Sequence, residues 1–350
     1  MKLRFDSSAW HKYMKNFHII HLRERIIGII RAFLKREGFH EVETPKLLPT
    51  PSTEPFLEVF ETQLKFSEGD TYRAFLPSSP EFALKKLLAK GFGSCFEICK
   101  SFRNGEGRSS RHSPEFTILE FYHVNGNYET VMRDVEQMFQ EIAREIFQKQ
   151  DFLYQGRQLS VRGPWERLSV SDAFKKYANI DQETLLSTQL LLTKAKQKGY
   201  TVTNETTWEE IYNQILFNEI EPHLGQRSPT FLYDYPISQA AFAQKKASDP
   251  RFAERFELFW AGYELGNCFS ELIDPIEQRK RCEKDLALRR KLRKTTFPLD
   301  EAFIHALEKG FPPTGGIALG LDRIIAIFAD TPSIHDTILF PVDTLFPPEV

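Results

Sequence analysis

Two stretches of the chain show the three-to-four spacing of apolar residues that is typical of amphipathic helices. In the first, apolar side chains fall at positions 22, 26, 29, 30, 33 and 34, with basic residues on the other face. Gly38 ends this helix, and residues 39–45 (FHEVETP) predict a short strand that a proline terminates. In the second, apolar residues at 131, 132, 135, 138, 139, 142 and 146 predict another long helix.

Alternating or short apolar runs predict the strands. They cover residues 95–99, 116–122, 229–236 and 252–272, and a glycine-spaced strand that runs into a helix over 315–328. Within 252–272, a two-residue hairpin turn at 261–262 would pair Trp260 with Tyr263 and Phe259 with Glu264.

Three further segments complete the outline. Ser-Pro-Glu at 79–81 predicts a helix start, with a serine cap and a proline at the first position. A charged helix is predicted over 276–294, and its Lys, Arg and Glu residues are typical of a solvated face. Residues 151–230 predict helices near 181–198 and 207–219 without recognisable chemistry, so we interpret them as an insertion packed on the core.

Composition narrows the class of protein. The 350 residues carry a formal net charge of −2, so nothing points to nucleic-acid binding by bulk charge. The 31 phenylalanines suit a large buried core, and the 4 cysteines predict neither a zinc site nor a disulfide framework. No apolar signal segment and no run long enough to span a bilayer is present. We therefore predict a soluble, cytoplasmic protein without membrane contacts.

A basic loop lies in the most informative stretch of the chain, residues 101–122. Arg103 precedes a polar loop that contains Arg108, Arg111 and His112. Guanidinium groups bind phosphate oxygens in pairs of hydrogen bonds, so the loop predicts a polyphosphate site. A solvated basic hairpin would show the same local pattern.

The strand after this loop adds a second candidate surface. Its alternation places Phe116, Ile118, Glu120 and Tyr122 on one face. That face offers a flat ring for stacking, and a carboxylate with a phenol for a polar group.

Two glutamates share a face of the predicted 252–272 hairpin. Glu257 and Glu264 would be diagonal neighbours, about 7 Å or less apart, and would repel each other without a cation between them. Magnesium with phosphate oxygens suits such a pair, although two surface glutamates on an ordinary hairpin would look the same. Strict alternation puts Asn267 and Glu271 on the opposite face unless the strand bulges, for which Gly266 is the candidate position.

Together these segments resemble the class II aminoacyl-tRNA synthetases, in the lysine-specific subgroup. Residues 101–122 resemble motif 2, whose usual form reads FRNEG…HNPEFTMLEFY, and residues 22–45 and 315–328 resemble motifs 1 and 3. Residues 264–272 are similar to the subgroup's E-x-x-N-G-F-S-E-L. The resemblance implies an α+β catalytic domain with a mostly antiparallel sheet flanked by helices, and a homodimer formed through the motif 1 unit.

The resemblance also implies roles for the matching residues. The ATP contacts would come from Arg103, Glu106, Arg111, His112, Phe116 and Arg323. Arg103 and Arg323 would be the catalytic residues, and Glu257 and Glu264 would bind Mg²⁺. The amino-acid pocket would consist of Glu81, Glu120, Tyr122, Asn267, Glu271 and Ala318. Several acidic groups around two amines suit a diamino acid, because a buried ammonium must be paired.

The implied reaction needs no protein nucleophile. A substrate carboxylate attacks the α-phosphorus of ATP, pyrophosphate leaves and an aminoacyl-adenylate forms, with arginines and magnesium stabilising the transferring group.

Three local features resemble the elongation factor P lysine ligases more than the lysyl-tRNA synthetases. They are Ser-Pro-Glu at 79–81, the P-x-S-Q-A pattern at 236–240, and Ala318 in place of a glycine. The chain also leaves no room for the anticodon-reading barrel of the synthetases. We therefore predict activation of lysine or (R)-β-lysine and its transfer to a lysine side chain of elongation factor P, with tRNA not expected as a partner.

The chain departs from the family pattern at a few positions. Gly105 stands where a glutamate normally contacts adenine, and Glu106 is the candidate replacement. Ser113 replaces an asparagine, Cys268 replaces a glycine, and Ser270 is synthetase-like where some ligases have histidine. Two alternatives stay open: a truncated lysyl-tRNA synthetase-like enzyme that acts on tRNA, and a non-catalytic sensor of an amino acid or nucleotide.

The predicted organisation has three parts. An N-terminal extension covers residues 1–19, the catalytic domain covers 20–345 and includes the 151–230 insertion, and a short tail covers 346–350.

Overall fold

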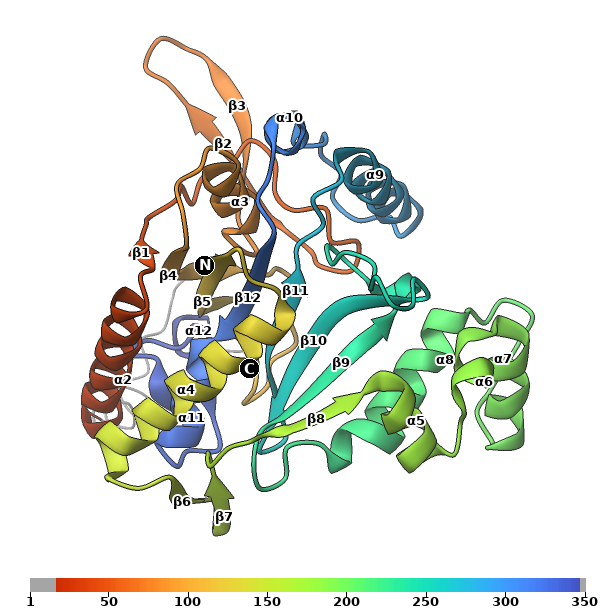
Figure 1. The fold of residues 1–350 in the computed structure, drawn as a ribbon. Coiled ribbons are helices and arrows are strands. Elements are labelled where there is room, and N and C mark those ends of the chain that lie inside the picture. Colours follow the sequence, from red (N-terminus) through yellow and green to blue (C-terminus); the bar gives the residue numbers. More distant parts are fainter. Residues whose placement is uncertain (1–16, 347–350) are drawn as a thin grey trace.

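An eight-stranded sheet lies at the centre of the computed structural model, which describes residues 17–346. The strands run in the order β1-β4-β5-β12-β11-β10-β9-β8 (Figure 1). Neighbours are antiparallel through the middle, and the two end pairs, β1 with β4 and β8 with β9, are parallel. The predicted α+β class is confirmed. The predicted extension at 1–19 and tail at 346–350 lie outside the described residues, apart from 17–19 and 346.

The strands of the sheet differ widely in length. Their bounds are β1 His40–Glu41, β4 Cys95–Phe102, β5 Glu115–Val124, β8 Glu166–Ser169, β9 Thr230–Pro236, β10 Phe252–Trp260, β11 Tyr263–Ser270 and β12 Thr314–Gly320. Two separate hairpins are formed by β2 (Phe60–Lys65) with β3 (Thr71–Leu76), and by β6 (Asp151–Tyr154) with β7 (Arg157–Ser160). The predicted strand at 39–45 is reduced to the two residues of β1.

One face of the sheet is covered by three helices. They are α2 (Phe17–Arg36), α4 (Tyr128–Phe147) and α11 (Leu321–Phe328). Their buried residues join apolar residues of the strands, such as Phe121, Ile317 and Cys268, in one large cluster. The two long helices predicted from apolar spacing are therefore confirmed, and their apolar stripes face the sheet.

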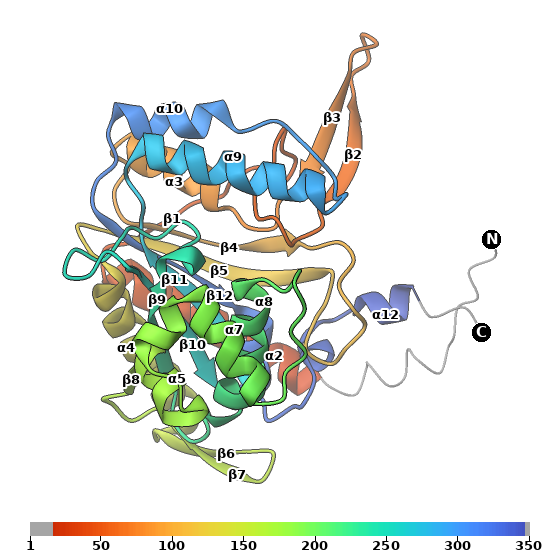
Figure 2. The same cartoon turned by 90° about the vertical axis from the view of Figure 1, so that its right-hand side faces the viewer.

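Three other helices gather at one end of the strands. α3 (Glu81–Ala89), α9 (Pro275–Lys291) and α10 (Glu301–Lys309) lie together beyond β4 and β5 (Figure 2). Stacking of Phe82 on Phe303, with ring centroids 4.3 Å apart, joins α3 to α10. Pro80, predicted as the first helical residue of α3, stands one position earlier, and Ser79 Oγ accepts a hydrogen bond from the Glu81 amide.

Residues 151–230 contain more regular structure than their pattern predicts. The β6–β7 hairpin, strand β8 and α5 (Val170–Ala178) were not expected. The predicted helix at 181–198 is divided at Ser187 into α6 (Gln182–Leu186) and α7 (Thr188–Gln197). The next helix is α8 (Trp208–Ile215), extended by η2 (Leu216–Ile220) and η3 (Glu221–His223).

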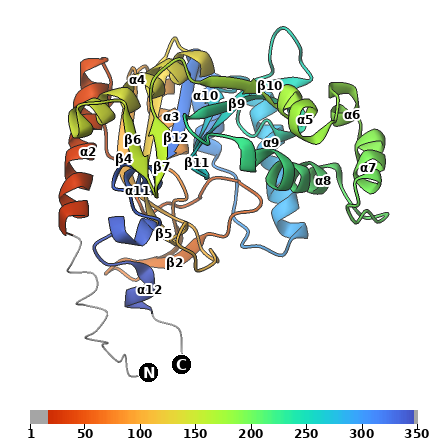
Figure 3. The ribbon, with the colours of Figure 1, turned by 90° about the horizontal axis from the view of Figure 1, so that it is seen from below.

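This segment is joined to the central sheet by both backbone and packing. β8 pairs with β9, and a second apolar cluster combines α5–α8 with Leu232, Tyr235 and Phe259 of β9 and β10. Figure 3 shows α2 and the α5–α8 group at opposite ends of the sheet. Short turns complete the chain: η4 (Ile237–Gln239), η5 (Ile334–Thr337) and α12 (Val342–Leu345).

The β10–β11 hairpin has the predicted register at its turn. Trp260 pairs with Tyr263, and Phe259 pairs with Glu264. Residues 261 and 262 both have positive φ, at 53° and 84°, which is the conformation of a tight hairpin turn of type I′.

Candidate active site

Four residues predicted to bind substrate or metal lie in one row across the sheet. Glu120 of β5 is paired with Ala318 of β12, Ala318 with Asn267 of β11, and Asn267 with Glu257 of β10. Directly paired residues of antiparallel strands share a face, so these four side chains leave the sheet on the same side. The other face is the apolar one under α2, α4 and α11.

A bulge brings Asn267 into this row. Leu258 pairs with Gly266, while the next residue of β10 pairs with Glu264, so Leu265 is the extra residue on β11. The predicted need for a bulge is confirmed, but its position at Gly266 was wrong by one residue. The extra residue reverses the alternation beyond it and so restores the rest of β11 to the face of the row.

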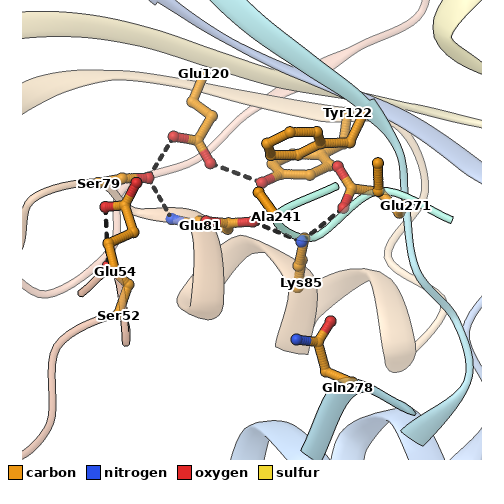
Figure 4. Close-up of polar contacts among 12 residues, drawn as sticks. Ser52, Glu54, Ser79, Glu81, Lys85, Glu120, Tyr122, Ala241, Glu271 and Gln278 are labelled. Carbon is orange, nitrogen blue, oxygen red and sulfur yellow. Dashed lines mark hydrogen bonds and ion pairs between the residues drawn. The ribbon is translucent and has the colours of Figure 1, made fainter. Parts of the chain in front are cut away.

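Carboxylates from three other places gather beside Glu120 (Figure 4). Glu81 begins α3, Glu271 follows β11, and Glu54 lies in the segment before β2. We call Glu54, Glu81, Glu120 and Glu271 the acidic cluster. Tyr122 Oη donates to one oxygen of Glu120 at 2.7 Å, and both residues are 2% exposed.

Ser79 binds the other oxygen of Glu120. Its Oγ donates to Glu120 Oε2 at 2.6 Å and accepts from the Glu81 amide at 3.0 Å. Ser79 therefore links the first turn of α3 to the carboxylate in β5.

Burial makes the acidic cluster resist full ionisation. Loss of water, and then the Glu81 carboxylate, raise the pKa of Glu120 to about 8. Loss of water also raises the pKa of Glu271 to about 7, against the opposing effect of Lys85, and burial raises the pKa of Glu54. Some of these carboxyls therefore carry protons at neutral pH, and a cationic ligand would displace them.

Lys85 supplies a positive charge inside the cluster. Its Nζ lies 2.6 Å from Glu81 Oε1 and 2.6 Å from Glu271 Oε2, and the side chain is 2% exposed. Lys85 thus forms ion pairs with both carboxylates.

Gly316 leaves the space that this arrangement needs. It is paired with Tyr122 across β12 and β5. A Cβ added at Gly316 would lie 2.2 Å from Glu271 Oε1 and 2.4 Å from Cε1 of Tyr122. A side chain at this position would therefore displace both groups.

Three arginines lie on the other side of the row, and we call Arg103, Arg111 and Arg323 the arginine group. The Arg103 guanidinium stacks on the Phe116 ring, 5.1 Å from its centroid, and its buried Nε has no hydrogen-bond partner among the described residues. An unpaired, buried donor atom on a half-buried cation suits an anionic ligand.

The other two arginines are held by backbone carbonyls. Arg111 Nη1 donates to Gly262 O at 2.9 Å, and its guanidinium lies 4.9 Å from the Tyr263 ring centroid. Arg323 Nη1 donates to Glu264 O at 2.7 Å. The tip of the β10–β11 hairpin thus positions both side chains.

Arg323 also depends on its neighbour in α11. Asp322 is 2% exposed, accepts from Arg23 Nη1 at 2.6 Å, and accepts from the Thr117 amide at 2.7 Å. These two hydrogen bonds join α2 and β5 to the start of α11, and they hold the backbone next to Arg323 in place.

The remaining residues of the predicted nucleotide site lie in the loop before β5. His112 Nδ1 is 2.9 Å from Ser109 Oγ, and burial, followed by Arg323, lowers the pKa of His112, so the ring is neutral at pH 7. The Glu106 carboxylate is close enough to act on the pKa values of both His112 and Arg323, which it raises against the opposing effect of burial.

The candidate magnesium ligands are the two glutamates of the hairpin. Glu257 accepts from Tyr235 Oη at 2.7 Å and from Arg255 Nη2 at 2.5 Å. Glu264 is an exposed residue, but loss of water around its carboxyl group, followed by the effect of the Glu257 carboxylate, raises its pKa to about 7. Burial and these two carboxylates also raise the pKa of Glu221 to about 7.

Residues 17–346 contain no group of three or more His, Cys, Asp or Glu side chains suited to a metal. A pair of repelling carboxylates nevertheless fits magnesium, which usually takes one or two carboxylates and completes its shell with phosphate oxygens and water.

Comparison with known proteins shows the family of the chain. The family described as "tRNA synthetases class II (D, K and N)" matches residues 4–344. The chain belongs to this family. It is 40% identical to a lysine–tRNA ligase of Moorella thermoacetica over 322 residues, which are 91% of this chain and 64% of that protein. Similar proteins named lysine–tRNA ligase occur in Dehalococcoides mccartyi (38% identical) and Staphylococcus haemolyticus (37%), each covering 91% of this chain and 63% of the relative.

This class II chain thus spans a little under two thirds of the length of those relatives. Within residues 17–346, no helix is long and apolar enough to cross a membrane.

Three side chains of the site were not predicted from the sequence. Lys85 stands one helical turn after Glu81, and this i, i+4 spacing was the available signal. Arg255 stands two residues before Glu257 on the same strand face, where it also donates to Asn267 Oδ1 at 3.1 Å. Glu54 had no signal, because only the folded chain brings its loop to α3.

Proposed function

We propose that this chain activates lysine or (R)-β-lysine with ATP and transfers it to a lysine side chain of elongation factor P. The observation that carries the proposal is the adjacency of two oppositely charged groups on one sheet face. The acidic cluster is suited to ammonium groups, and the arginine group is suited to phosphates.

The charges of the acidic cluster support a diamino acid. Lys85 pairs with Glu81 and Glu271, and Glu120 accepts hydrogen bonds from the neutral hydroxyls of Ser79 and Tyr122, so the ionised cluster keeps an excess of negative charge around a single ammonium. A substrate with two ammonium groups would offset most of it, whereas a side-chain carboxylate would be repelled.

The arginine group supports adenylate formation. A substrate carboxylate oxygen would form a bond to the α-phosphorus of ATP while the bond to the pyrophosphate oxygen breaks. Arg103 and Arg323 would stabilise the charge on the phosphoryl oxygens, Phe116 would stack on adenine, and Arg111 would bind the outer phosphates. Glu106 and His112 would complete the nucleotide site.

Glu257 and Glu264 would hold magnesium in this proposal. When bound, the ion supplies charge neutralisation for the phosphates. The assignment is supported by the position of both glutamates on the β10–β11 hairpin, where the Glu257 carboxylate raises the pKa of Glu264.

The choice of acceptor rests on three local features and their contacts. Ser79, in place of the alanine usual in the synthetases, donates to Glu120, which an alanine could not do. Gln239 O accepts from Arg255, which binds Glu257 and Asn267, so the 236–240 segment contacts the row. Ala318 lies between Glu120 and Asn267, where a methyl group narrows the space beside the substrate amine.

A second candidate is aminoacylation of tRNA. The names of the similar proteins, which are lysine–tRNA ligases, favour it. The proposed homodimer through residues 22–45 and the cytoplasmic location would be common to both candidates.

A labelling experiment separates these candidates. The protein is incubated with ATP, magnesium and labelled lysine or (R)-β-lysine, with elongation factor P in one tube and bulk tRNA in another. We expect label on one lysine of the factor, located by mass spectrometry of its peptides. Label on tRNA alone would identify a lysyl-tRNA synthetase-like enzyme, and failure to exchange pyrophosphate into ATP with any amino acid would indicate a sensor.

A further inference from the structure

Lys85 lies between two carboxylates of the acidic cluster, and its position is unusual for a lysine. It lies on the inner side of α3 and makes two contacts of 2.6 Å, to Glu81 and to Glu271. Its ammonium also lies 4.9 Å from the ring centroid of Phe242. Two carboxylates and an aromatic face therefore enclose the three N–H bonds, so Lys85 acts within the protein rather than on a ligand.

The two carboxylates come from parts of the chain that are far apart in sequence. Glu81 begins a helix and Glu271 follows a strand of the central sheet. The Lys85 ammonium contacts one oxygen of each carboxylate, Oε1 of Glu81 and Oε2 of Glu271. Glu81 Oε2 and Glu271 Oε1 have no hydrogen-bond or ion-pair partner within the described residues. Each carboxylate thus has one fixed oxygen and one that remains available.

Other charged groups around Lys85 come from several elements. Glu120 and Tyr122 face it from β5, Glu54 lies nearby before β2, and Cys282 of α9 lies close enough to be affected by Glu81. The neighbouring side chains from α10 and from the 240–243 loop are aromatic, Phe303 and Phe242. The guanidinium groups of Arg103 and Arg255 act on Glu54, whereas Lys85 is in direct contact with Glu81 and Glu271.

We propose that Lys85 is a positioning residue of the substrate site: its ammonium holds Glu81 and Glu271 in place and offsets their negative charge, so that their free oxygens receive the substrate amines. This inference rests on the proposed function, in which the acidic cluster binds a diamino acid. Lys85 sets the geometry and charge of the carboxylates and does not itself touch the substrate.

The test compares two neighbouring lysines of α3. Lys85→Met removes the internal cation, and Lys86→Met is the matched control, because Lys86 is 32% exposed and pairs with Asp300 on the outside. KM for lysine, KM for ATP and kcat are measured by pyrophosphate exchange between pH 7 and pH 9. At each pH, the KM of the variant is divided by the wild-type KM, because this ratio cancels the titration of the substrate itself.

Loss of Lys85 should weaken lysine binding in a pH-dependent way. Without the ammonium, a proton neutralises one of the facing carboxyls at pH 7, and this proton leaves as pH rises. In Lys85→Met we expect KM for lysine at pH 7 to be about tenfold or more above the wild-type value. The ratio of the Lys85→Met KM to the wild-type KM should then fall at least about threefold by pH 9. KM for ATP should stay unchanged in Lys85→Met, and Lys86→Met should match wild type throughout.

Two results would overturn the inference. One is an unchanged KM for lysine in Lys85→Met, and the other is an increase that is the same at every pH, which loss of packing alone would produce. If thermal melting shows that Lys85→Met does not fold, Lys85→Gln is measured instead, since it keeps two N–H donors without the charge. Wild-type KM in Lys85→Gln at pH 7 would then overturn the inference.

Wild-type protein separates this inference from the proposed function. If it exchanges pyrophosphate with neither lysine nor (R)-β-lysine, both fail. If it does so and the Lys85 variants behave as wild type, only the positioning role fails.

Discussion

The acidic cluster and the arginine group lie on the same sheet face but are built in opposite ways. In the acidic cluster, Glu81, Glu120 and Glu271 are buried and each depends on a contact with Lys85, Ser79 or Tyr122. In the arginine group, Arg111 and Arg323 lie nearer to solvent and are held by backbone carbonyls of the hairpin. A change in the acidic cluster should therefore spread to its neighbours, whereas a change in the arginine group should remain local.

This difference fits the proposed ligands. An amino acid with two ammonium groups is small and must be recognised at several points, which favours a rigid, desolvated set of partners. A triphosphate carries its charge over a longer distance, and separate cations along its path are sufficient.

The largest effect is expected at Glu257 and Glu264, the proposed magnesium ligands. Glu264→Gln removes a charge beside Glu257, so we expect adenylate formation to fall by about a thousandfold or more. Pyrophosphate exchange measures this loss. Glu254→Gln is the matched control, because Glu254 alternates to the other face of β10 and pairs with Gln244. Near-normal turnover in Glu264→Gln would refute the magnesium role.

A smaller loss is expected within the arginine group. Arg103→Lys keeps the charge but cannot donate two parallel hydrogen bonds or stack as a plane on Phe116. We expect kcat/KM for ATP to fall about a hundredfold, with KM for lysine changed by no more than about threefold. Steady-state kinetics with each substrate varied in turn will check this, and an equal rise in both KM values would contradict a local effect. Lys100→Arg, at an exposed pair with Glu115, serves as the control.

The pH dependence of lysine binding tests the acidic cluster. The pKa of Glu120 is raised to about 8, so this carboxyl is mostly protonated at pH 7 and ionised at pH 9. Because ammonium binding requires the ionised form, KM for lysine in Glu120→Gln, divided by the wild-type KM at the same pH, should rise by up to about tenfold over this range. Taking this ratio cancels the titration of the substrate amines. A ratio that stays constant from pH 7 to pH 9 would show that Glu120 does not titrate in this range.

The smallest effect is expected at Ala318. Ala318→Gly removes one methyl group from between Glu120 and Asn267, and the enlarged space should shift preference toward α-lysine. We expect the ratio of kcat/KM for α-lysine to that for (R)-β-lysine to rise about tenfold, the range expected for one methyl group in a pocket. An unchanged ratio would remove Ala318 as a determinant of substrate choice.

Local patterns predicted the parts of the fold that depend on nearby residues. The spacing of apolar residues located α2 and α4, and the turn residues at 261–262 set the pairing of Phe259 with Glu264. The predicted strand at 39–45 failed because β1 is an edge strand with a single neighbour, and two residues satisfy its pairing with β4. The spacing of apolar residues cannot predict this strand length, because it depends on the neighbouring strand in the folded sheet.

The sequence by itself determined the family, the fold class and the residue types that carry the candidate chemistry, because motif spacing and hydrophobic period are local properties of the chain. Only the tertiary structure decided which side chains meet. The bulge at Leu265 turned Asn267 toward Glu257, the packing of α3 placed Lys85 between Glu81 and Glu271, and the pairing of β5 with β12 set Gly316 against Tyr122. Each of these contacts joins residues far apart in sequence, and its energy arises from burial that exists only once the sheet and helices have assembled.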